Sequence, residues 1–224
     1  MIEYTLSRSN RKTVALYVRD GFIEVRAPKR MAKRDIDRFV ASKEQWAKRK
    51  LAELKKRAEE KREFLLNYGE LVTYRGKEYP ITGRQGIDSG IDYAGFYMPE
   101  GLTEAHIKEN CIQIYRENAN LYLPERTFYF AEILSVRPKS VKISNAKSLW
   151  GSCSRKKSIN YSWRIMMADD DVIDYLVVHE LAHLIELNHS ARYWKIVEKL
   201  LPDYRARRAK LRTLQKKLSI EDWD

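Results

Sequence analysis

Residues 171–194 read DVIDYLVVHELAHLIELNHSARYW, and they form the most informative segment of the chain. Three aspartates, at 169–171, precede the apolar part of this segment; they suit the positive end of a helix dipole and offer an N-cap. Apolar residues then cover most of one helix: Val172, Ile173, Leu176, Val177, Leu181, Leu184, Ile185 and Leu187. Such an apolar surface predicts a buried helix.

Inside this helix lies the pattern His179-Glu180-Leu181-Ala182-His183. Two histidines four residues apart stand on one helical face, so both imidazoles can reach one Zn²⁺ at ~2.0–2.1 Å. Glu180 follows the first histidine and can reach a metal-bound water, which is the geometry of a metalloprotease general base. The pattern predicts a metal site that performs hydrolysis.

The third ligand is expected to be His189, six residues after His183. An unbroken helix would carry His189 off the ligand face, but Asn188 is a residue that often terminates helices. A helix that stops near Leu187 or Asn188 lets the chain turn His189 back toward the metal. Three histidines with an open position make a catalytic site rather than a closed structural one. Glu198 is the runner-up third ligand.

Other side chains near this segment are candidates for supporting roles. Glu186 lies roughly on the face of the two histidines and could orient a ligand. Tyr193 or Tyr204 could donate a hydrogen bond to an oxyanion. Cys153 is a candidate thiolate ligand and Cys111 a candidate nucleophile, although both also fit small residues in or near a core.

The charge is spread unevenly over the 224 residues, whose formal net charge is +12. Residues 1–70 hold 19 Lys/Arg against 11 Asp/Glu, and residues 205–217, RARRAKLRTLQKK, hold seven basic residues and no acid. Basic surfaces attract polyanions, so we expect weak, sequence-independent nucleic-acid binding through the N-terminal helix and residues 205–217. The alternative is a pair of ordinary solvated helix faces.

Composition bounds the class and the compartment. With 44% hydrophobic and 33% charged residues, the chain has the make-up of a globular protein. No stretch approaches the ~18 uncharged apolar residues of a spanning helix, and the N-terminus lacks the order of a secretory signal. The two cysteines form no disulfide framework, so a cytoplasmic location without a membrane partner is expected.

The first hundred residues alternate between strand and helix patterns. Residues 13–18 and 22–27 predict a hairpin around Asp20-Gly21. Residues 32–67 contain no Gly or Pro and predict one long helix or two abutting helices. Short strands are expected over residues 71–99, with bends at the glycines inside them.

The second half is expected to begin with a helix from about residue 101, which Pro124 breaks or restarts. Strands follow over residues 139–150 and 158–163. The sequence thus predicts residues 1–100 as a hairpin, a long basic helix and short strands, and 101–224 as the catalytic region. Because the composition shifts little near residue 100, both parts could also form one domain.

Several motifs together resemble the YgjP-like family of predicted zinc metallopeptidases, which is related to SprT-like and Wss1-like zincins. Tyr193 stands where that family usually has Phe. The match runs from the N-terminal hairpin to Pro202-Asp203-Tyr204. It is carried by Trp150-Gly151-Ser152-Cys153-Ser154, Ile159-Asn160, IDYLVVHELAH over 173–183, Asn188-His189-Ser190 and Trp194.

This resemblance implies an α+β, zincin-like fold in which a small sheet lies over the helix that bears the HExxH motif. It also implies His179, His183 and His189 as zinc ligands, with Glu180 catalytic. The histidine spacing matches metzincins too, but Glu186 replaces their glycine and no Met follows His189, which excludes their Met-turn. Related SprT-like and Wss1-like enzymes act on DNA-bound proteins.

We therefore expect a zinc metallopeptidase that hydrolyses peptide bonds by a Glu-activated zinc-bound water. The strand around Trp150, Gly151, Ser152 and Cys153 is expected to bind substrate backbone as an added strand. One alternative is a zinc hydrolase of a non-peptide amide, which residue spacing does not separate from a peptidase. Another is a nucleic-acid-associated module acting on DNA-bound protein; the intact Glu180 argues against lost catalysis.

Overall fold

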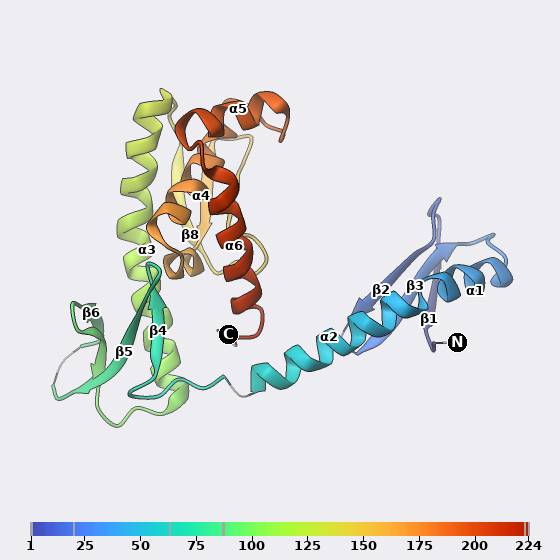
Figure 1. The fold of residues 1–224 in the computed structure, drawn as a ribbon, viewed down its shortest axis with the longest axis horizontal. Helices are drawn as coiled ribbons and strands as arrows, with labels where there is room; N and C mark the ends of the chain where they lie inside the picture. Colours follow the sequence, from blue (N-terminus) through green and yellow to red (C-terminus); the bar gives the residue numbers. More distant parts are fainter. Residues whose placement is uncertain (1, 20, 63, 87, 222, 224) are drawn as a thin grey trace. The chain divides into compact units, whose positions relative to one another are not determined.

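The computed structural model describes residues 2–19, 21–62, 64–86, 88–221 and 223. Its contacts divide the chain into two compact α+β units, one of residues 1–64 with 219–222 and one of 65–218 with 223–224 (Figure 1). In this division the strands within 71–99 are grouped with the second unit, where β7 contacts the long helix that follows it. The boundary expected near residue 100 stays a prediction.

The first unit is a three-stranded sheet with two helices. Its strands are β1 (Thr5–Ser9), β2 (Ala15–Arg19) and β3 (Phe22–Pro28), in the order β1-β3-β2. Strand β2 is antiparallel to β3, which confirms the expected hairpin, whereas β1 pairs parallel to β3. Helices α1 (Lys33–Ser42) and α2 (Glu44–Arg62) confirm the alternative of two abutting helices.

The hairpin turn and the core of this unit follow from the pattern of the sequence. Gly21 has a φ of +85°, which L-residues with a side chain rarely adopt. Asp20, the other expected turn residue, lies outside the described residues. Alternate residues of β3 point into the core, where they meet the apolar face of the helices: Ile23, Val25, Ala27, Ile36, Val40 and Ala47.

The second unit opens with a four-stranded sheet that confirms the short strands expected over residues 71–99. Its strands are β4 (Leu71–Tyr74), β5 (Lys77–Arg84), β6 (Gly90–Asp92) and β7 (Gly95–Pro99). Their order is β4-β5-β7-β6, with β5 parallel to β7 and the other two pairs antiparallel. Gly95, at a φ of +134°, begins β7 at one of the expected bends.

Helix α3 (Glu104–Leu134) shows that the expected break at Pro124 is wrong, because the helix runs straight through it. A proline inside a helix removes one backbone hydrogen bond and costs ~3 kcal/mol. Here buried residues on both sides of the proline hold the helix in one piece, among them Leu123 and Thr127. The Thr127 hydroxyl donates to the Leu123 carbonyl at 2.6 Å across the proline.

A second sheet of three short strands follows α3. Strands β8 (Ser140–Ser144), β9 (Gly151–Cys153) and β10 (Ser158–Ser162) have the order β8-β10-β9, so β9 is an edge strand antiparallel to β10. The strand expected over 139–150 therefore ends early, at Ser144. The reason is that Asn145 turns inward, where its side-chain oxygen accepts a hydrogen bond from the Trp163 indole at 2.8 Å.

A short 3-10 helix, η1 (Trp163–Met167), leads to the last three helices. These are α4 (Asp170–Ala182), α5 (Ala191–Leu200) and α6 (Tyr204–Leu218). Helix α4 is the buried centre of the unit, because α3, α5, α6 and β9 all pack against it. Among the described helices, none is both long and apolar enough to cross a membrane.

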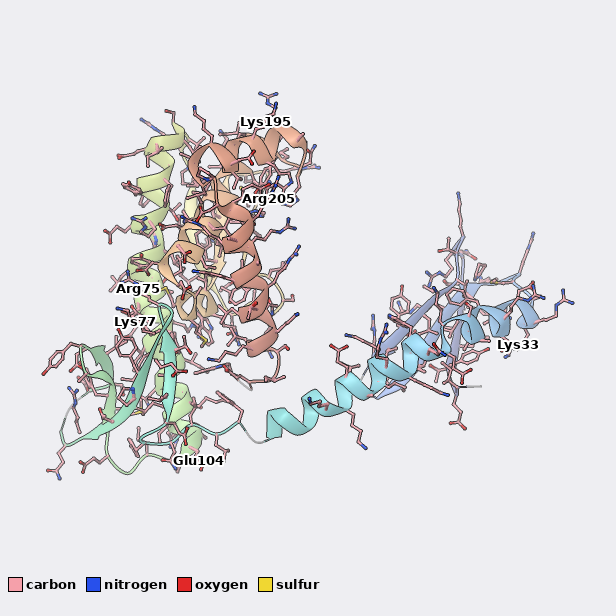
Figure 2. All side chains as sticks on the ribbon, viewed as in Figure 1. Lys33, Arg75, Lys77, Glu104, Lys195 and Arg205 are labelled. Atoms are coloured by element: carbon pink, nitrogen blue, oxygen red, sulfur yellow. The ribbon has the colours of Figure 1, made fainter. Side chains whose placement is uncertain are left out.

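The three aspartates at the start of α4 act differently from the expected cap. Asp169 occupies the N-cap position but makes no side-chain capping bond. Its carboxylate instead pairs with Lys210 of α6 at 2.9 Å, and Asp171 pairs with the same amine at 3.1 Å. Asp170 forms a two-bond ion pair with Arg75, in the turn between β4 and β5 (Figure 2). The aspartates therefore tie the start of α4 to its neighbours.

Candidate metal centre

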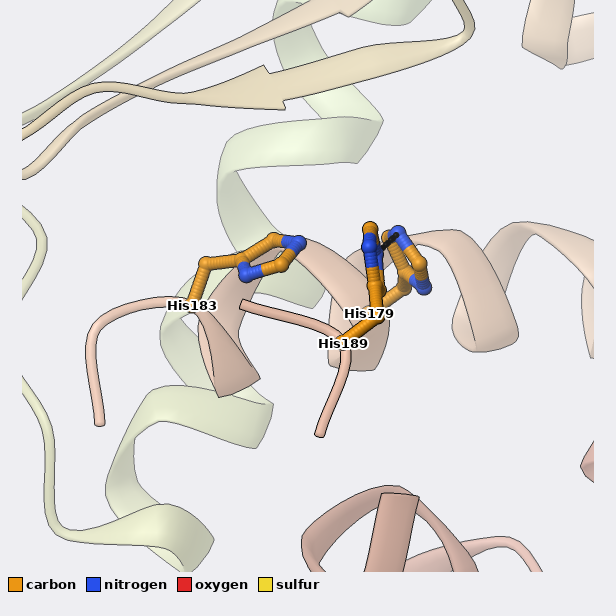
Figure 3. A group of neighbouring side chains, drawn as sticks. All are labelled: His179, His183 and His189. Atoms are coloured by element: carbon orange, nitrogen blue, oxygen red, sulfur yellow. Dashed lines mark hydrogen bonds between the residues drawn. The ribbon is translucent and has the colours of Figure 1, made fainter. Parts of the chain in front are cut away.

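His179, His183 and His189 lie together at the C-terminal end of α4 (Figure 3). Each offers a ring nitrogen, and these three atoms lie within 4.8 Å of one another. The Nε2 atoms of His179 and His189 are 3.3 Å apart. Two nitrogens bound to one tetrahedral Zn²⁺ at ~2.0–2.1 Å are separated by ~3.3 Å. The donor set and its spacing therefore fit a zinc ion.

The chain returns to the cluster sooner than expected. Helix α4 ends at Ala182, with His183 as its C-cap, so the expected stop near Leu187 or Asn188 is wrong. Leu187 is 65% exposed and outside the helix, because the polypeptide turns before it can continue the apolar face. Helix α5 begins just after His189. Its N-cap is Ser190, whose hydroxyl accepts a hydrogen bond from the Tyr193 N–H at 3.2 Å.

The His183 ring is oriented by the turn that follows it. Its Nδ1 lies 3.1 Å from the backbone carbonyl oxygen of Glu186. A carbonyl only accepts, so Nδ1 carries the proton and Nε2 keeps its lone pair for another partner. The Glu186 carboxylate lies instead 4.0 Å from Arg192. Glu186 thus contacts the histidine through its main chain, not through the side chain that sequence reasoning considered.

Tyr193 fills the space behind all three imidazoles. Its ring centroid lies 4.6 Å from that of His183, 4.8 Å from His189 and 5.4 Å from His179. The side chain is fully buried, and its hydroxyl donates to the backbone carbonyl of His179 at 2.8 Å. Tyr193 therefore packs the cluster from within, and an oxyanion role for its hydroxyl stays a prediction.

An aromatic stack extends the cluster on the side of His189. The Trp194 ring stacks on His189 with centroids 5.7 Å apart, and Tyr204 stacks on Trp194 at 5.2 Å. The Tyr204 hydroxyl accepts a bond from Arg205 at 3.2 Å, and its oxyanion role likewise stays a prediction. The Arg208 guanidinium lies 5.1 Å from the Trp194 ring centre. Sequence reasoning counted Arg208 only as one charge in a basic run.

The surroundings of His179 and His189 favour the neutral form of these two rings. Burial, with the neighbouring charges of His183 and His189, lowers the pKa of His179 to about 3. Burial also lowers the pKa of His189, and the charge of Arg208 acts in the same direction on both rings. Neutral imidazole is the form that binds metal ions. Among the described residues, Nδ1 of His179 is a buried nitrogen without a hydrogen-bond partner.

The Glu180 side chain is buried, only 4% exposed. Burial raises the pKa of its carboxyl to about 8. Strand β9 passes against it, and the Glu180 charge reaches Cys153, where it joins burial in raising the thiol pKa. A carboxyl that exchanges its proton near neutral pH has the property that a general base needs.

Two candidates from the sequence lie away from this cluster. Cys111 is fully buried in α3, and burial raises its thiol pKa to about 12, so it has no thiolate to act as a nucleophile. Glu198, the alternative third ligand, is exposed on α5 and does not belong to the group of potential ligand atoms.

Comparison with known proteins gives the family of the chain. The chain belongs to the YgjP-like family, whose metallopeptidase-domain model matches residues 12–214 and confirms the resemblance. The crystal structure of the metallopeptidase zymogen of Pyrococcus abyssi abylysin is 26% identical, with 42% of this chain and 93% of that chain covered. Its TM-score against this chain is 0.37. No curated protein matches the chain.

Proposed function

We propose that this chain is a zinc-dependent metallopeptidase in which His179, His183 and His189 hold the metal and Glu180 is the general base. The observation that carries the proposal is the convergence of three ring nitrogens within 4.8 Å of one another, with the buried Glu180 next to His179 in the same helix. The family match supports the peptidase class and hence a peptide substrate.

Zinc, when bound, would lower the pKa of a water molecule and polarise the carbonyl of the bond to be cleaved. Glu180 accepts the proton of the attacking water and returns it to the leaving amine. Burial favours the protonated form of the carboxyl, so Glu180 can hold the proton between these two steps. The Glu186 carbonyl meanwhile fixes which nitrogen of His183 carries the hydrogen.

Strand β9 is the proposed docking edge for the substrate backbone. It pairs with β10 on one side, and no other strand of the described residues flanks its other side. An extended peptide can add to such an edge through main-chain hydrogen bonds. Because β9 also packs on α4, a peptide on this edge would lie beside Glu180.

Two measurements test this function. Metal analysis of the purified protein is expected to find about one zinc per chain, and an unbiased peptide library is expected to contain cleaved sequences. Zinc binding with no cleaved peptide, but turnover of a small amide, would favour the non-peptide hydrolase instead. Absence of zinc after loading would overturn the proposal.

Nucleic-acid binding is a second proposal, which the unequal distribution of charge supports. Ion pairs within the protein occupy some of the basic side chains in residues 205–217, which leaves fewer of them to bind phosphate groups. Arg207 pairs with Asp203 at 2.9 Å, and Lys210 pairs with the aspartates that start α4. Arg205 and Arg212 are exposed on α6, and Arg205 extends from the start of the helix (Figure 2).

A cytoplasmic location stays a prediction.

A further inference from the structure

A cavity of about 310 Å³ lies directly beside His179 and Glu180. One wall is the segment that leads into β9, including Trp150 and Gly151. The turn of α4 before His179 forms a second wall, and α6 forms the third. A peptide on the β9 edge would have a side chain next to this opening. The cavity is therefore placed to take part in substrate selection.

The wall from α6 brings two arginines to the cavity. Arg208 and Arg212 are four residues apart, so they stand on one helical face, and both line the cavity. Within the described part of the chain, neither guanidinium belongs to an ion pair, whereas Arg207 and Lys210 of the same helix are paired with aspartates. The two unpaired charges thus lie on the side of α6 that lines the cavity.

Their positions are held relative to the site. Arg208 lies over Trp194, which stacks on His189, so its guanidinium is tied to the metal-ligand cluster. Arg208 and Arg212 line the cavity together with Tyr175, the residue of α4 one turn before His179. The remaining lining includes apolar Leu176 and Leu211.

We infer that this cavity binds the substrate side chain next to the cleaved bond, and that Arg208 and Arg212 select a carboxylate there. The inference rests on the proposed peptidase function. Glu180 is the single acidic residue in the lining, so the two guanidiniums leave the cavity with an excess of positive charge. Arginine matches a carboxylate with two parallel N–H donors, and the apolar walls suit the methylene groups of an acidic side chain.

Binding of small chelating ligands tests the inference without any substrate. Three peptide hydroxamates share one scaffold and differ only in the side chain next to the chelating group: glutamyl, glutaminyl or leucyl. Calorimetry on the zinc-loaded full chain is expected to give at least ~10-fold tighter binding of the glutamyl compound than of its uncharged isostere, from charge-assisted hydrogen bonds. The ratio is expected to fall to about 1 in the Arg208→Gln/Arg212→Gln variant.

The matched control is Lys195→Gln/Lys199→Gln, which removes two positive charges from exposed positions on α5 outside the cavity; Figure 2 labels Lys195. It should keep the glutamyl preference. A further pair of leucyl compounds, one ending in a free carboxylate and one in an amide, tests whether the bound carboxylate is the C-terminus of the peptide. A preference for the free acid that is lost in the arginine variant supports the carboxylate site and assigns it to the C-terminus.

The outcomes separate the cavity from the metal centre. Two outcomes overturn the cavity inference and leave the zinc site intact. One is equal binding of the glutamyl and glutaminyl compounds together with no preference for the free acid. The other is a preference that survives in the arginine variant. If no hydroxamate binds in a zinc-dependent manner, the proposed metal centre fails and the inference fails with it. Retained leucyl binding in the arginine variant confirms that the variant is folded and loaded.

Discussion

A Cβ atom built on Gly151 would lie 2.6 Å from Oε1 of Glu180 and 2.8 Å from its Cγ. A side chain at position 151 would force the Glu180 side chain to shift, so the absence of a Cβ there lets β9 pass directly against the Glu180 carboxyl group. The docking edge and the proposed general base are therefore in contact. Gly151 is a positioning residue for Glu180 through its lack of a side chain.

Substituting Gly151 by Ala is expected to displace Glu180 and lower kcat by about 10- to 100-fold, because a misplacement of ~1 Å can cost ~10²-fold. The zinc content should not change, since the atoms nearest to the new methyl group belong to Glu180 and not to a histidine. Kinetics and metal analysis on the same sample measure both. Ser152→Ala, at an exposed position of the same strand, is the control. Full activity of Gly151→Ala would show that the contact is without effect.

Replacing Glu180 by Gln is expected to leave zinc bound and to lower turnover ~10²–10⁴-fold, since Gln keeps the shape but cannot accept a proton. Metal analysis and cleavage of any peptide from the library screen provide the two readouts. Turnover at the parental rate would remove Glu180 from the mechanism. Loss of zinc together with activity would show a structural role instead.

Replacing His189 by Ala is expected to weaken zinc binding strongly, because two histidines remain from a three-histidine set. Competition with a chelator of known affinity measures the change. His106→Ala is the matched control, since His106 is exposed on α3 and bonds to Thr103 away from the cluster. If His189→Ala binds zinc as tightly as this control, another residue is the third ligand.

The parts of the fold that local signals determine were predictable from the sequence. A turn glycine between two β-rich runs predicts the β2–β3 hairpin, and the 3.6-residue periodicity predicts the site helix. The pair His179 and His183 follows from spacing alone. Each of these depends on residues close together in the chain, where backbone geometry leaves few alternatives.

The parts that depend on tertiary contacts were not predictable in this way. Pro124 is a helix breaker by local rules, but burial on both sides of it keeps α3 continuous. The early end of α4 depends on a turn in which His183 bonds to the Glu186 carbonyl. Arg208 and Arg212 could have been found as an i,i+4 pair. Their place beside Glu180 follows from how α6 packs on α4, which no local pattern contains.

The two thiols are expected to differ in reactivity. Burial raises the pKa of Cys111 to about 12, so at pH 8 it remains a thiol, and its thiolate fraction grows only as the pH approaches that value. Cys153 is partly exposed. An aromatic disulfide reagent should therefore label at most one thiol per native chain at pH 8, and two after denaturation. Rapid labelling of both in the native protein would contradict the burial of Cys111.

Nucleic-acid binding is expected to be weak, independent of sequence and strongly dependent on salt. Binding through counterion release should fall steeply between ~50 and ~200 mM salt, and each lost phosphate contact should reduce the slope of log K against log salt by ~0.9. Neutralising Arg205, Arg208 and Arg212 to Gln is expected to reduce this slope, since these three cations are exposed on α6. Fluorescence anisotropy with a labelled oligonucleotide measures it.

The paired cations of the same helix supply the contrast. Arg207→Gln/Lys210→Gln removes two charges that are already bonded to Asp203, Asp169 and Asp171. It should lower thermal stability and leave the salt slope nearly unchanged. A surface that binds nucleic acid through free charges requires the first variant to affect binding more than the second. No binding at ~50 mM salt, or binding insensitive to salt, would mean that α6 is an ordinary solvated face.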